Sequence, residues 1–528
     1  MIYLLASGVK DNAKEIVHAA LTRSFTSSMV ESLSFVALSD KIKTATQQQY
    51  FLVIIDPLEV WVDLLLEIYE NSNAKLLILG AIPPKLAGYL GVDVRALPDE
   101  ILSAASCEPA KSYEFAESKM QVEYSNSIGS FHSSITNRPF LRYDFTDEWN
   151  NLGYGAIRVD SSIWSLSAIV SVPESACIAN IASAKIEFGA YAALWSGDKA
   201  SILWFNRSVG PVDSVEWELV ESYFGDYRPA ELPCIPYLSE IPYGYKAAVT
   251  MRLDCDEDIE SARPLWEAYQ LMEVPFSLAI HTKVLTDELQ YQLPRDVIVA
   301  GGALLSHTAT HAPDWGGSYD TAVNEAKTSK QLIKDKIGCD VRYAVSPFHQ
   351  TPIYARSALS DTGYSGCVGG IIRNDPDFLM GRSGVPPFSD TGFIGHSQQC
   401  MLHGDCMLGT DDSLAIFKLA FELAYKSNTF FGYLDHPFSP RYQYGWVSEE
   451  QRISAHESFV AYMKSWPDVL FANENDAMDF LRSRSCVRIK KNSESYTVMP
   501  DKAFEAKWTV KICYKGSRFK LTKQGVTI

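Results

Sequence analysis

The pattern of hydrophobic and polar positions changes along this chain, and each pattern predicts a different kind of unit. Up to about residue 105, short and almost wholly apolar runs alternate with stretches that are apolar at helical spacing. The runs at 51–55 and 75–79 are typical of parallel strands that are buried on both faces. We therefore expect a small doubly wound α/β domain, of the Rossmann or flavodoxin type, over residues 1–108. It contains neither a GxGxxG motif nor a P-loop, so the sequence does not support nucleotide binding.

After this domain the pattern becomes short β-type runs separated by Gly, Ser, Asn and Pro. Such runs predict a β-rich, sandwich-like domain with a proline-containing linker over residues 109–243. Its tryptophans can stack on sugar rings, but buried core positions are the simpler interpretation. From residue 244 the pattern is a strand followed by a helix, repeated about seven times, which predicts a parallel barrel over residues 244–486. A basic, β-rich tail is expected at 487–528.

Composition and charge narrow the class of protein. A chain of 528 residues exceeds what one hydrophobic core supports, so several domains are expected. The net charge of −17 argues against nucleic acid as a general partner. Residues 487–528 carry 10 Lys and Arg against 3 Asp and Glu, which can attract an anionic glycan or lipid headgroup, although a solvated tail is the simpler interpretation. No apolar run reaches about 18 residues, so no transmembrane segment is predicted.

The cysteines and the first residues bear on the compartment. The ten cysteines are scattered without a CxxC pair, as is usual in a reducing compartment. The apolar run that begins at Met1 is too short for a signal peptide and lacks a basic leader. We expect a cytoplasmic location.

Candidate chemistry lies at the ends of three apolar runs in the predicted barrel. Asp254 and Asp256 end the first run, His307 and His311 follow the second, and His436 follows the third. Because side chains alternate along a strand, the two aspartates share a face. A catalytic Zn²⁺ ion usually takes three N or O ligands from the protein and activates water at its open position. One aspartate and two histidines match that need, and barrels of this kind place their chemistry at the carboxyl ends of strands.

These motifs resemble those of the polysaccharide deacetylases, the NodB-type carbohydrate esterases of family 4. The first motif of that family is an acidic pair after a strand, which is met by Asp254-Cys255-Asp256. The second, His-[Ser/Thr]-x-x-His, is met by His307-Thr308-Ala309-Thr310-His311, and the fifth, Leu-x-His, by Leu434-Asp435-His436. The resemblance covers roughly residues 244 to 484 and implies a distorted (β/α)7 barrel.

The resemblance also implies a role for each matching residue. Asp254 corresponds to the general base and His436 to the general acid. Asp256, His307 and His311 correspond to the metal ligands. Zn²⁺ is the default metal, and the ligand types admit another divalent transition metal.

The third and fourth motifs match less well. The third motif, Arg-x-Pro-[Phe/Tyr], is met only in part, because Val345 stands where the family has arginine, before Ser346 and the matching Pro347 and Phe348. In the family this arginine helps to orient the catalytic aspartate, together with an acid of the fourth motif, for which residues 370–375 offer no secure match. Pro347, Phe348 and the following His349 are expected to contact substrate.

The other histidines of this region have weaker signals. His281 ends a predicted strand and is interpreted as a structural or pocket-wall residue. Nothing in the sequence distinguishes His396 and His403 from loop histidines.

Three functional hypotheses follow from these residues. The first is a metal-dependent hydrolase that removes acetyl groups from N-acetylated amino sugars of a glycan or glycolipid. The second keeps the same site but makes the protein an O-acetyl esterase or a deformylase. The third, motivated by the missing arginine and the aromatic middle domain, is a non-catalytic glycan-binding protein. Metal content and the type of bond cleaved separate the three, and the oligomeric state stays open.

Overall fold

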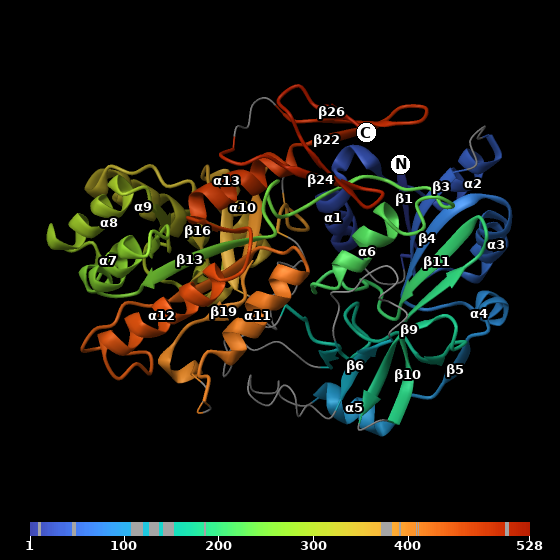
Figure 1. Ribbon diagram of the computed structural model, residues 1–528, viewed down its shortest axis with the longest axis horizontal. Helices are drawn as coiled ribbons and strands as arrows, with labels where there is room; N and C mark the ends of the chain where they lie inside the picture. Colours follow the sequence, from blue (N-terminus) through green and yellow to red (C-terminus); the bar gives the residue numbers. More distant parts are fainter. Residues whose placement is uncertain are drawn as a thin grey trace.

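The computed structural model describes residues 1–8, 12–44, 49–106, 120–125, 137–140, 153–183, 186–370, 383–389, 392–407, 409, 411–501 and 506–528. These residues form two lobes (Figure 1). One lobe holds a mixed sheet from the first half of the chain, and the other holds a parallel sheet from the second half, with helices around it. The fourth-motif segment that follows Gly370 lies outside the described residues.

The first lobe is built on strands that are apolar on both faces. Its parallel strands have the order β2-β1-β3-β4. In β3, Phe51 and Val53 belong to the apolar cluster that contains helix α1, whereas Leu52 and Ile54 belong to the cluster that contains α3. Helices therefore pack on both faces of this part of the sheet. The bounds are β1 (Ile2–Ala6), α1 (Ala13–Phe25), β2 (Val30–Ser32), β3 (Gln49–Ile55), α3 (Val62–Asn71) and β4 (Asn73–Leu79).

The prediction of a separate sandwich-like domain over residues 109–243 is wrong. The described strands of residues 109–243 mostly extend the first sheet, whose full order is β2-β1-β3-β4-β11-β10-β9-β6-β7. Strand β11 pairs in parallel with β4, and the strands beyond it are antiparallel. Every residue of β11 is buried, and buried backbone groups need hydrogen-bonding partners. The position of β11 between β4 and β10 supplies these partners on both edges of the strand. The bounds are β6 (Gln121–Tyr124), β7 (Arg138–Pro139), β9 (Cys177–Ser183), β10 (Ile186–Ser196) and β11 (Ala200–Phe205).

The second lobe is a nearly closed parallel barrel. Eight strands follow one another in the order β18-β17-β16-β15-β14-β13-β20-β19, and β21 also pairs with β13. The sequence predicted about seven strands here, and β18 and β19 are not among the runs that predicted them. With only two residues, β19 leaves no periodic pattern in the sequence. The bounds are β13 (Ala247–Cys255), β14 (Ser277–Ile280), β15 (Ala303–Ser306), β16 (Tyr343–Val345), β17 (Gly366–Gly370), β18 (Ile394–Gln398), β19 (Cys400–Met401), β20 (Phe431–Asp435) and β21 (Val469–Ala472).

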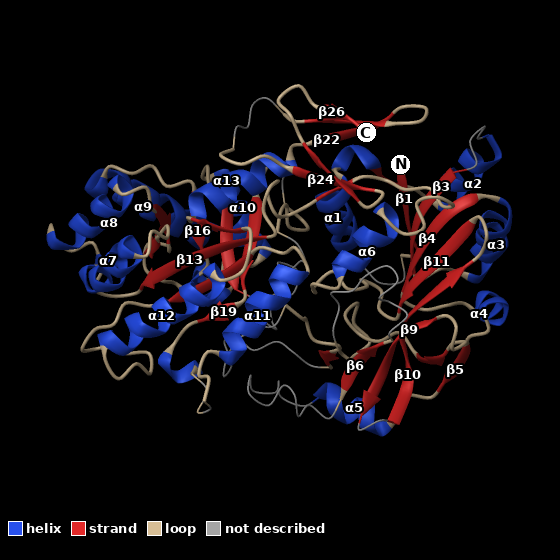
Figure 2. Cartoon of the chain, viewed as in Figure 1, coloured by secondary structure: helices blue, strands red, loops and turns tan. Residues whose placement is uncertain are grey.

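Helices surround the barrel (Figure 2). Three of them begin at side-chain caps: Ser318, Ser448 and Asn473 each accept the backbone N–H of the residue three positions later. Such caps contribute about 1 kcal/mol each, which defines where these helices start. The bounds are α7 (Arg263–Leu271), α8 (Leu289–Val299), α9 (Tyr319–Ile337), α10 (Ile353–Asp361), α11 (Ala415–Lys426), α12 (Glu449–Lys464) and α13 (Glu474–Ser485).

Strand β13 has an apolar outer face and a polar inner face. Val249, Met251 and Leu253 belong to the apolar cluster that contains residues of α7, α11 and α12. The residues between and after them, Arg252 and Asp254, are equally buried but lie on the opposite face because the side chains alternate. The barrel interior is therefore polar where β13 reaches its carboxyl end.

Glu474 adds an ionisable group to this interior. It is fully buried at the start of α13 and accepts a hydrogen bond from Gln398 Nε2. Burial raises the pKa of its carboxyl group from 4.5 to about 7, although the charge of Arg252 opposes that rise. Since the folded state holds this proton more tightly than the unfolded chain does, the stabilisation is complete below about pH 4.5 and is lost as the pH rises through about 7.

Glu474→Gln is expected to remove this pH dependence. From about pH 6 to about pH 8 the parent should lose about 1 kcal/mol of its free energy of unfolding through this carboxyl group, whereas an amide does not ionise. Thermal or urea unfolding of both proteins at the two pH values measures the difference. An equal loss of stability in parent and variant would contradict the assignment.

The C-terminal segment packs against the first lobe. Strands β22 (Arg488–Lys491), β23 (Tyr496–Met499) and β26 (Val526–Thr527) form one small sheet, and β24 (Lys511–Tyr514) pairs with β12 (Tyr237–Leu238). Ile489, Val498 and Ile512 are buried in the same apolar cluster as Phe25 of α1. One face of this basic segment is therefore part of a core, and Lys511, which is buried, donates to the carbonyl oxygen of Tyr245.

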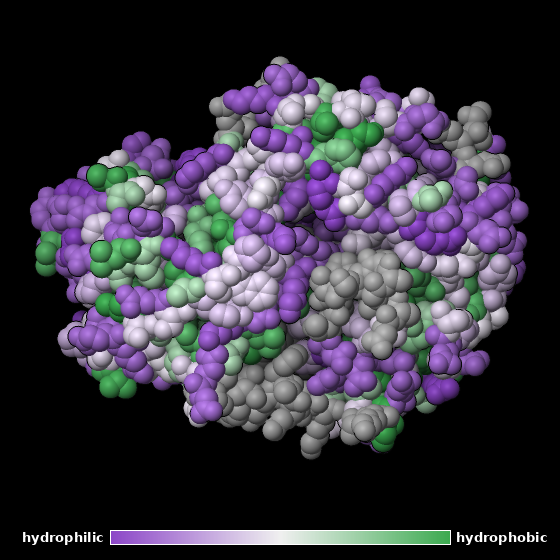
Figure 3. Space-filling view, in the orientation of Figure 1, coloured by the Kyte–Doolittle hydropathy of each residue, from purple (hydrophilic) through white to green (hydrophobic). Residues whose placement is uncertain are grey.

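Hydrophilic side chains cover most of the described surface on the face drawn in Figure 3, and the hydrophobic patches among them are separate. None of the helices in the described ranges combines the length and the apolar character needed to cross a membrane.

Candidate metal and catalytic site

The predicted metal ligands, base and acid come from the ends of three strands, β13, β15 and β20. Strand β13 is flanked by β14 and β20, and β15 pairs with β14, so the carboxyl ends of these strands lie at one end of the barrel. Asp254 and Asp256 stand at the end of β13, His307 directly follows β15, and His436 directly follows β20. The structure brings these four residues and His311 together.

Asp256, His307 and His311 form a cluster that can hold a metal ion. Asp256 Oδ1 lies 3.5 Å from His307 Nε2 and 3.5 Å from His311 Nε2. Ligands bound at about 2.1 Å to a tetrahedral Zn²⁺ ion lie about 3.4 Å apart, so this spacing fits such an ion. Asp256 Oδ1 is also buried and has no hydrogen-bond partner among the described residues. A cation bound by the three residues would satisfy it.

The second nitrogen of His307 fixes the orientation of its ring. His307 Nδ1 lies 3.1 Å from the carbonyl oxygen of Val345, so it carries the proton and donates it, which leaves Nε2 as an acceptor. Burial lowers the pKa of His307 to about 4, although Asp254 opposes the shift. A neutral imidazole that is held through its other nitrogen is the usual form of a metal ligand.

The loop that carries the two histidines is held by Glu325 of α9. Its carboxylate accepts the backbone N–H groups of Ala309 and Thr310 at 2.8 and 2.9 Å. Thr308 and His311 have positive φ angles of 71° and 58°, a region that residues other than glycine rarely occupy. The contacts with Glu325 stabilise this strained loop in the conformation that turns His311 toward Asp256.

The charge of Asp256 is stabilised from several sides. Burial opposes its ionisation, but the hydrogen-bonding and charge effects of His436, His307 and His311 hold the pKa of this carboxyl group well below its usual range. His436 Nε2 is 3.4 Å from Asp256 Oδ2, the oxygen that does not face the other two histidines. Asp256 is therefore an anion between three imidazoles.

Asp254, the predicted base, is held by an arginine of its own strand. Arg252 Nε donates to Asp254 Oδ1 at 2.6 Å, and Arg252 Nη2 donates to Asp254 Oδ2 at 3.1 Å. Burial opposes the ionisation of Asp254, but Arg252 and then His307 bring its pKa down to about 2. Its carboxylate is ionised at neutral pH and keeps further lone pairs that can accept a proton.

The three residues predicted to contact substrate, Pro347, Phe348 and His349, differ in how far they are exposed to solvent. Phe348 is 43% exposed, and its ring centroid lies 4.7 Å from that of His311. Pro347 and His349 are buried, and the imidazole of His349 packs against Gly370, where an added Cβ would lie 2.5 Å from its Nδ1. Phe348 and His349 both have positive φ angles, so this turn is strained at the site. Of the three, Phe348 is the residue placed to meet a ligand.

His436 is enclosed by other rings. Its Nδ1 lies 2.7 Å from His403 Nε2, and the ring of Tyr444 stacks on it at a centroid distance of 4.2 Å. Burial disfavours the protonated form, but hydrogen bonding to Asp256 and the charges of Asp256, Asp254 and Asp435 outweigh it and raise the pKa of His436. Burial lowers the pKa of His403 to about 3, so the neutral member of the pair is His403. The proton of the pair therefore resides on His436.

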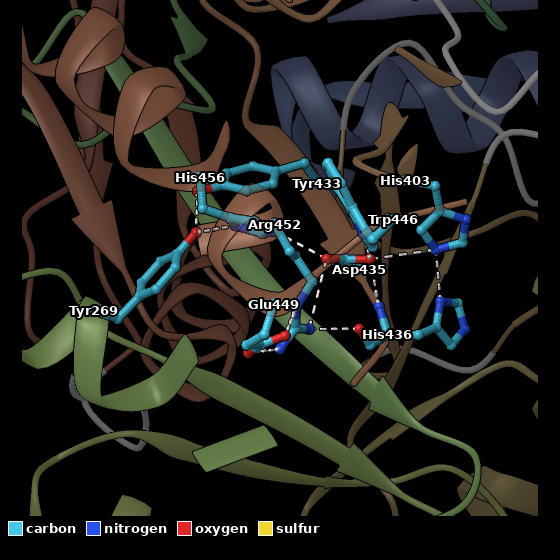
Figure 4. Close-up of polar contacts among 9 residues, drawn as sticks. All are labelled: Tyr269, His403, Tyr433, Asp435, His436, Trp446, Glu449, Arg452 and His456. Atoms are coloured by element: carbon cyan, nitrogen blue, oxygen red, sulfur yellow. Dashed lines mark hydrogen bonds and ion pairs between the residues drawn. The ribbon is translucent and has the colours of Figure 1, made fainter. Parts of the chain in front are cut away.

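Asp435, the middle residue of the Leu-x-His motif, organises a buried network that reaches His436 (Figure 4). Its Oδ2 accepts from His456 Nε2 at 3.0 Å and lies 3.7 Å from Arg452 Nη1. Arg452 Nη1 also donates to the carbonyl oxygen of His436 at 2.6 Å, and His456 Nδ1 lies 2.9 Å from the Tyr269 hydroxyl. The network thus holds the backbone of His436 in place.

A second group of metal-binding residue types, His403, Asp435 and His436, lies within this network. Here the charge of Asp435 is already balanced by Arg452, and its remaining contacts are hydrogen bonds. We therefore interpret this group as a hydrogen-bonded support for His436, and the group that contains Asp256 as the metal site.

The sequence did not assign a role to several residues that the structure places at the site. The position of Arg252 could have been inferred from the sequence, because residues two apart along a strand lie on the same face, and Arg252 is two residues before Asp254. Nothing in the sequence distinguishes His403 from a loop histidine, and no motif includes Tyr444. Their contact with His436 depends on the packing of segments that are distant in sequence, and no local pattern records it.

No protein-family model and no curated protein matches this sequence. Solved structures match it at low sequence identity. A structure described as a novel carbohydrate deacetylase, Agd3, is 10% identical, with a TM-score of 0.40 over 100% of this chain and 98% of the other. A putative polysaccharide deacetylase from Mycobacterium smegmatis is 14% identical, with a TM-score of 0.38 over 46% of this chain and 93% of the other.

A family 4 pseudoenzyme from Bacillus anthracis is 11% identical, with a TM-score of 0.29 over 45% of this chain and 66% of the other. Polysaccharide deacetylases, the family that the sequence motifs resemble, are thus among the structures that match at low identity.

Proposed function

We propose that this protein is a metal-dependent hydrolase that removes acetyl groups from N-acetylated amino sugars of a glycan or glycolipid. One observation carries the proposal: Asp256 Oδ1 stands 3.5 Å from the Nε2 atoms of both His307 and His311, while Asp254 and His436 lie beside this group. A ligand cluster flanked by a proton acceptor and a proton donor is what hydrolysis of an amide requires.

Asp256, His307 and His311 would hold the ion. A divalent cation in that position lowers the pKa of water to about 7 and polarises a carbonyl group. Zn²⁺ is the default for one carboxylate and two imidazoles, and other divalent transition metals accept the same ligands.

Asp254 and His436 divide the proton transfers. As the oxygen of water forms its bond to the acetyl carbon, the carboxylate of Asp254 accepts the proton that water loses. When the C–N bond breaks, His436 donates a proton to the departing amine. The products are acetate and a free amino sugar, and general catalysis of this kind is worth about 10² to 10⁴ in rate.

Phe348 and Tyr444 would position the reacting groups. The backbone N–H near Phe348 is proposed to stabilise the oxyanion of the tetrahedral intermediate. The exposed ring of Phe348, next to His311, can pack on a face of the sugar. Tyr444, which stacks on His436, keeps the imidazole from rotating away.

The experiment combines metal analysis with acetate release. The purified protein, loaded with Zn²⁺, is assayed on N-acetylhexosamine oligosaccharides and on O-acetylated sugars of the same length. We expect about one metal ion per chain and acetate from the N-acetylated substrates. Acetate from the esters alone would favour an O-acetyl esterase. Formate from N-formylated sugars alone would favour a deformylase. Stoichiometric metal without turnover on any of them would favour a glycan-binding protein.

A cytoplasmic location is also a proposal. The nine cysteines within the described residues form no disulfide with one another, and a reducing compartment maintains cysteines in that form. Fractionation of cells that produce the full-length protein tests it, since recovery outside the cytoplasm would contradict it.

A further inference from the structure

Arg252 and Asp254 form a forked ion pair within one strand. The two side chains point to the same face because they are two residues apart on β13. Two nitrogens of the guanidinium group donate to the two oxygens of the carboxylate, at 2.6 and 3.1 Å. The side chains are 0% and 3% exposed, so water does not compete for these bonds.

The third-motif segment supplies no cation to this carboxylate. Val345 is fully buried at the end of β16, in the apolar cluster that includes Val368 of the neighbouring strand β17. Its backbone still takes part in the site, since its carbonyl oxygen accepts from His307 Nδ1. The positive charge beside Asp254 therefore comes from β13 and not from β16.

A second buried carboxyl group feels the charge of Arg252. Glu474 is fully buried, and the charge of Arg252 is the main influence that opposes the rise in the pKa of Glu474. Glu474 is in turn hydrogen-bonded by Gln398 and reaches Thr250, two residues before Arg252 on the same face of β13. Thr250, Arg252 and Asp254 thus form one polar row along the inside of the strand, with Glu474 beside it.

We propose that Arg252 is the positioning residue that fixes the carboxylate of Asp254 toward the reacting water. In this way Arg252, two residues before the base on the same strand, replaces the arginine that is missing at Val345. The inference rests on the proposed function, because it assigns Arg252 to the base of that reaction. A planar fork with two parallel hydrogen bonds fixes the plane of a carboxylate, whereas a lysine ammonium group supplies charge without that geometry.

The variant Arg252→Lys separates the effect of the positive charge from that of the planar guanidinium fork, because lysine keeps the charge and loses the fork. We expect this variant to keep its metal and its KM but to lose about ten-fold or more in kcat, since misplacing a catalytic group by about 1 Å costs up to 10²-fold. Arg207→Lys is the matched control: Arg207 also forms a fully buried fork with an aspartate, donating through Nη1 and Nη2 to Asp213 at 3.0 and 3.0 Å, in the other lobe. The control should keep the parental kcat.

A relocation experiment tests the role directly. Arg252→Met should lose kcat further, and adding Val345→Arg to it should restore part of the activity by presenting a guanidinium group from β16. In the Asp254→Asn background, Arg252→Lys should lower kcat no further, because a residue that acts only through Asp254 has nothing left to position.

The outcomes distinguish this inference from the proposed function. An active parent whose Arg252→Lys variant is folded, metal-loaded and fully active would overturn the role of Arg252 alone. A further loss in the Asp254→Asn background equal to that in the parent would also overturn it, since Arg252 would then act elsewhere. A metal-loaded parent with no turnover on any acetylated sugar would overturn both.

Discussion

His307→Ala is expected to lose both the metal ion and turnover. The imidazole supplies one of three ligand atoms, with Nε2 3.5 Å from Asp256 Oδ1, and it is oriented by the Val345 carbonyl group. Charge stabilisation by a catalytic metal is worth several kcal/mol, so kcat should fall by about 10³-fold or more. Elemental analysis of the purified variant and acetate release from an N-acetylhexosamine oligosaccharide measure the two losses.

The control for this variant is His18→Ala. His18 lies half-buried on α1 in the other lobe, so its removal tests the effect of deleting an imidazole away from the site. It should keep one metal ion per chain and the parental kcat. Full metal content and full turnover in His307→Ala would remove the group formed by Asp256, His307 and His311 from the mechanism.

Asp254→Asn is expected to keep the metal and lose turnover. An amide has almost the same shape as the carboxylate, and its oxygen can still accept a hydrogen bond from Arg252. It cannot take a proton from water, so kcat should fall by about 10² to 10⁴-fold while metal content and KM change little. The comparison of kcat, KM and bound metal with the parent makes the measurement.

Asp258→Asn is the matched control, because it changes an exposed carboxylate only four residues further along the chain. Its kcat should equal that of the parent. If Asp254→Asn also matched the parent, Asp254 would not be the base, and the fork with Arg252 would be a structural ion pair only.

The two variants together discriminate between the functional hypotheses. A hydrolase should respond to both, in the manner described, whether the bond is an amide or an ester. A glycan-binding protein should lose metal in His307→Ala and show no change in Asp254→Asn, since binding does not require a proton acceptor. In the sequence, the missing third-motif arginine was a reason to consider a non-catalytic binding protein. The structure weakens that reason, because Arg252 lies beside the proposed base Asp254.

Features with a short sequence period were predictable. The alternation along β13 places Asp254 and Asp256 on one face, and the apolar runs that precede His307 and His436 end as strands in the barrel. The α/β character of the start of the chain was visible for the same reason, since β3 and β4 are apolar at every buried position except Lys75. These predictions depend on local geometry that each residue imposes on its near neighbours.

Strand pairing over long distances was not predictable. The sandwich expected at 109–243 was wrong, because β11 pairs with β4, more than 120 residues earlier. The sequence of a β-type run does not specify the strand with which it pairs. Strand β19 was missed because its two residues, Cys400 and Met401, have no period. Sheet order is decided by which apolar faces and edges are left to be covered once all strands are present.

The sequence by itself determined the ligand types, their order and the strand ends that carry them, because these depend on residue identity and on the two-residue repeat of a strand. The tertiary structure alone decided that Asp256 Oδ1 lies between two imidazoles and that Glu325 holds their loop. It also decided that His403 and Tyr444 enclose His436. Contacts of this kind join segments that approach each other only when the whole barrel is packed, and burial then sets the protonation of the groups they enclose.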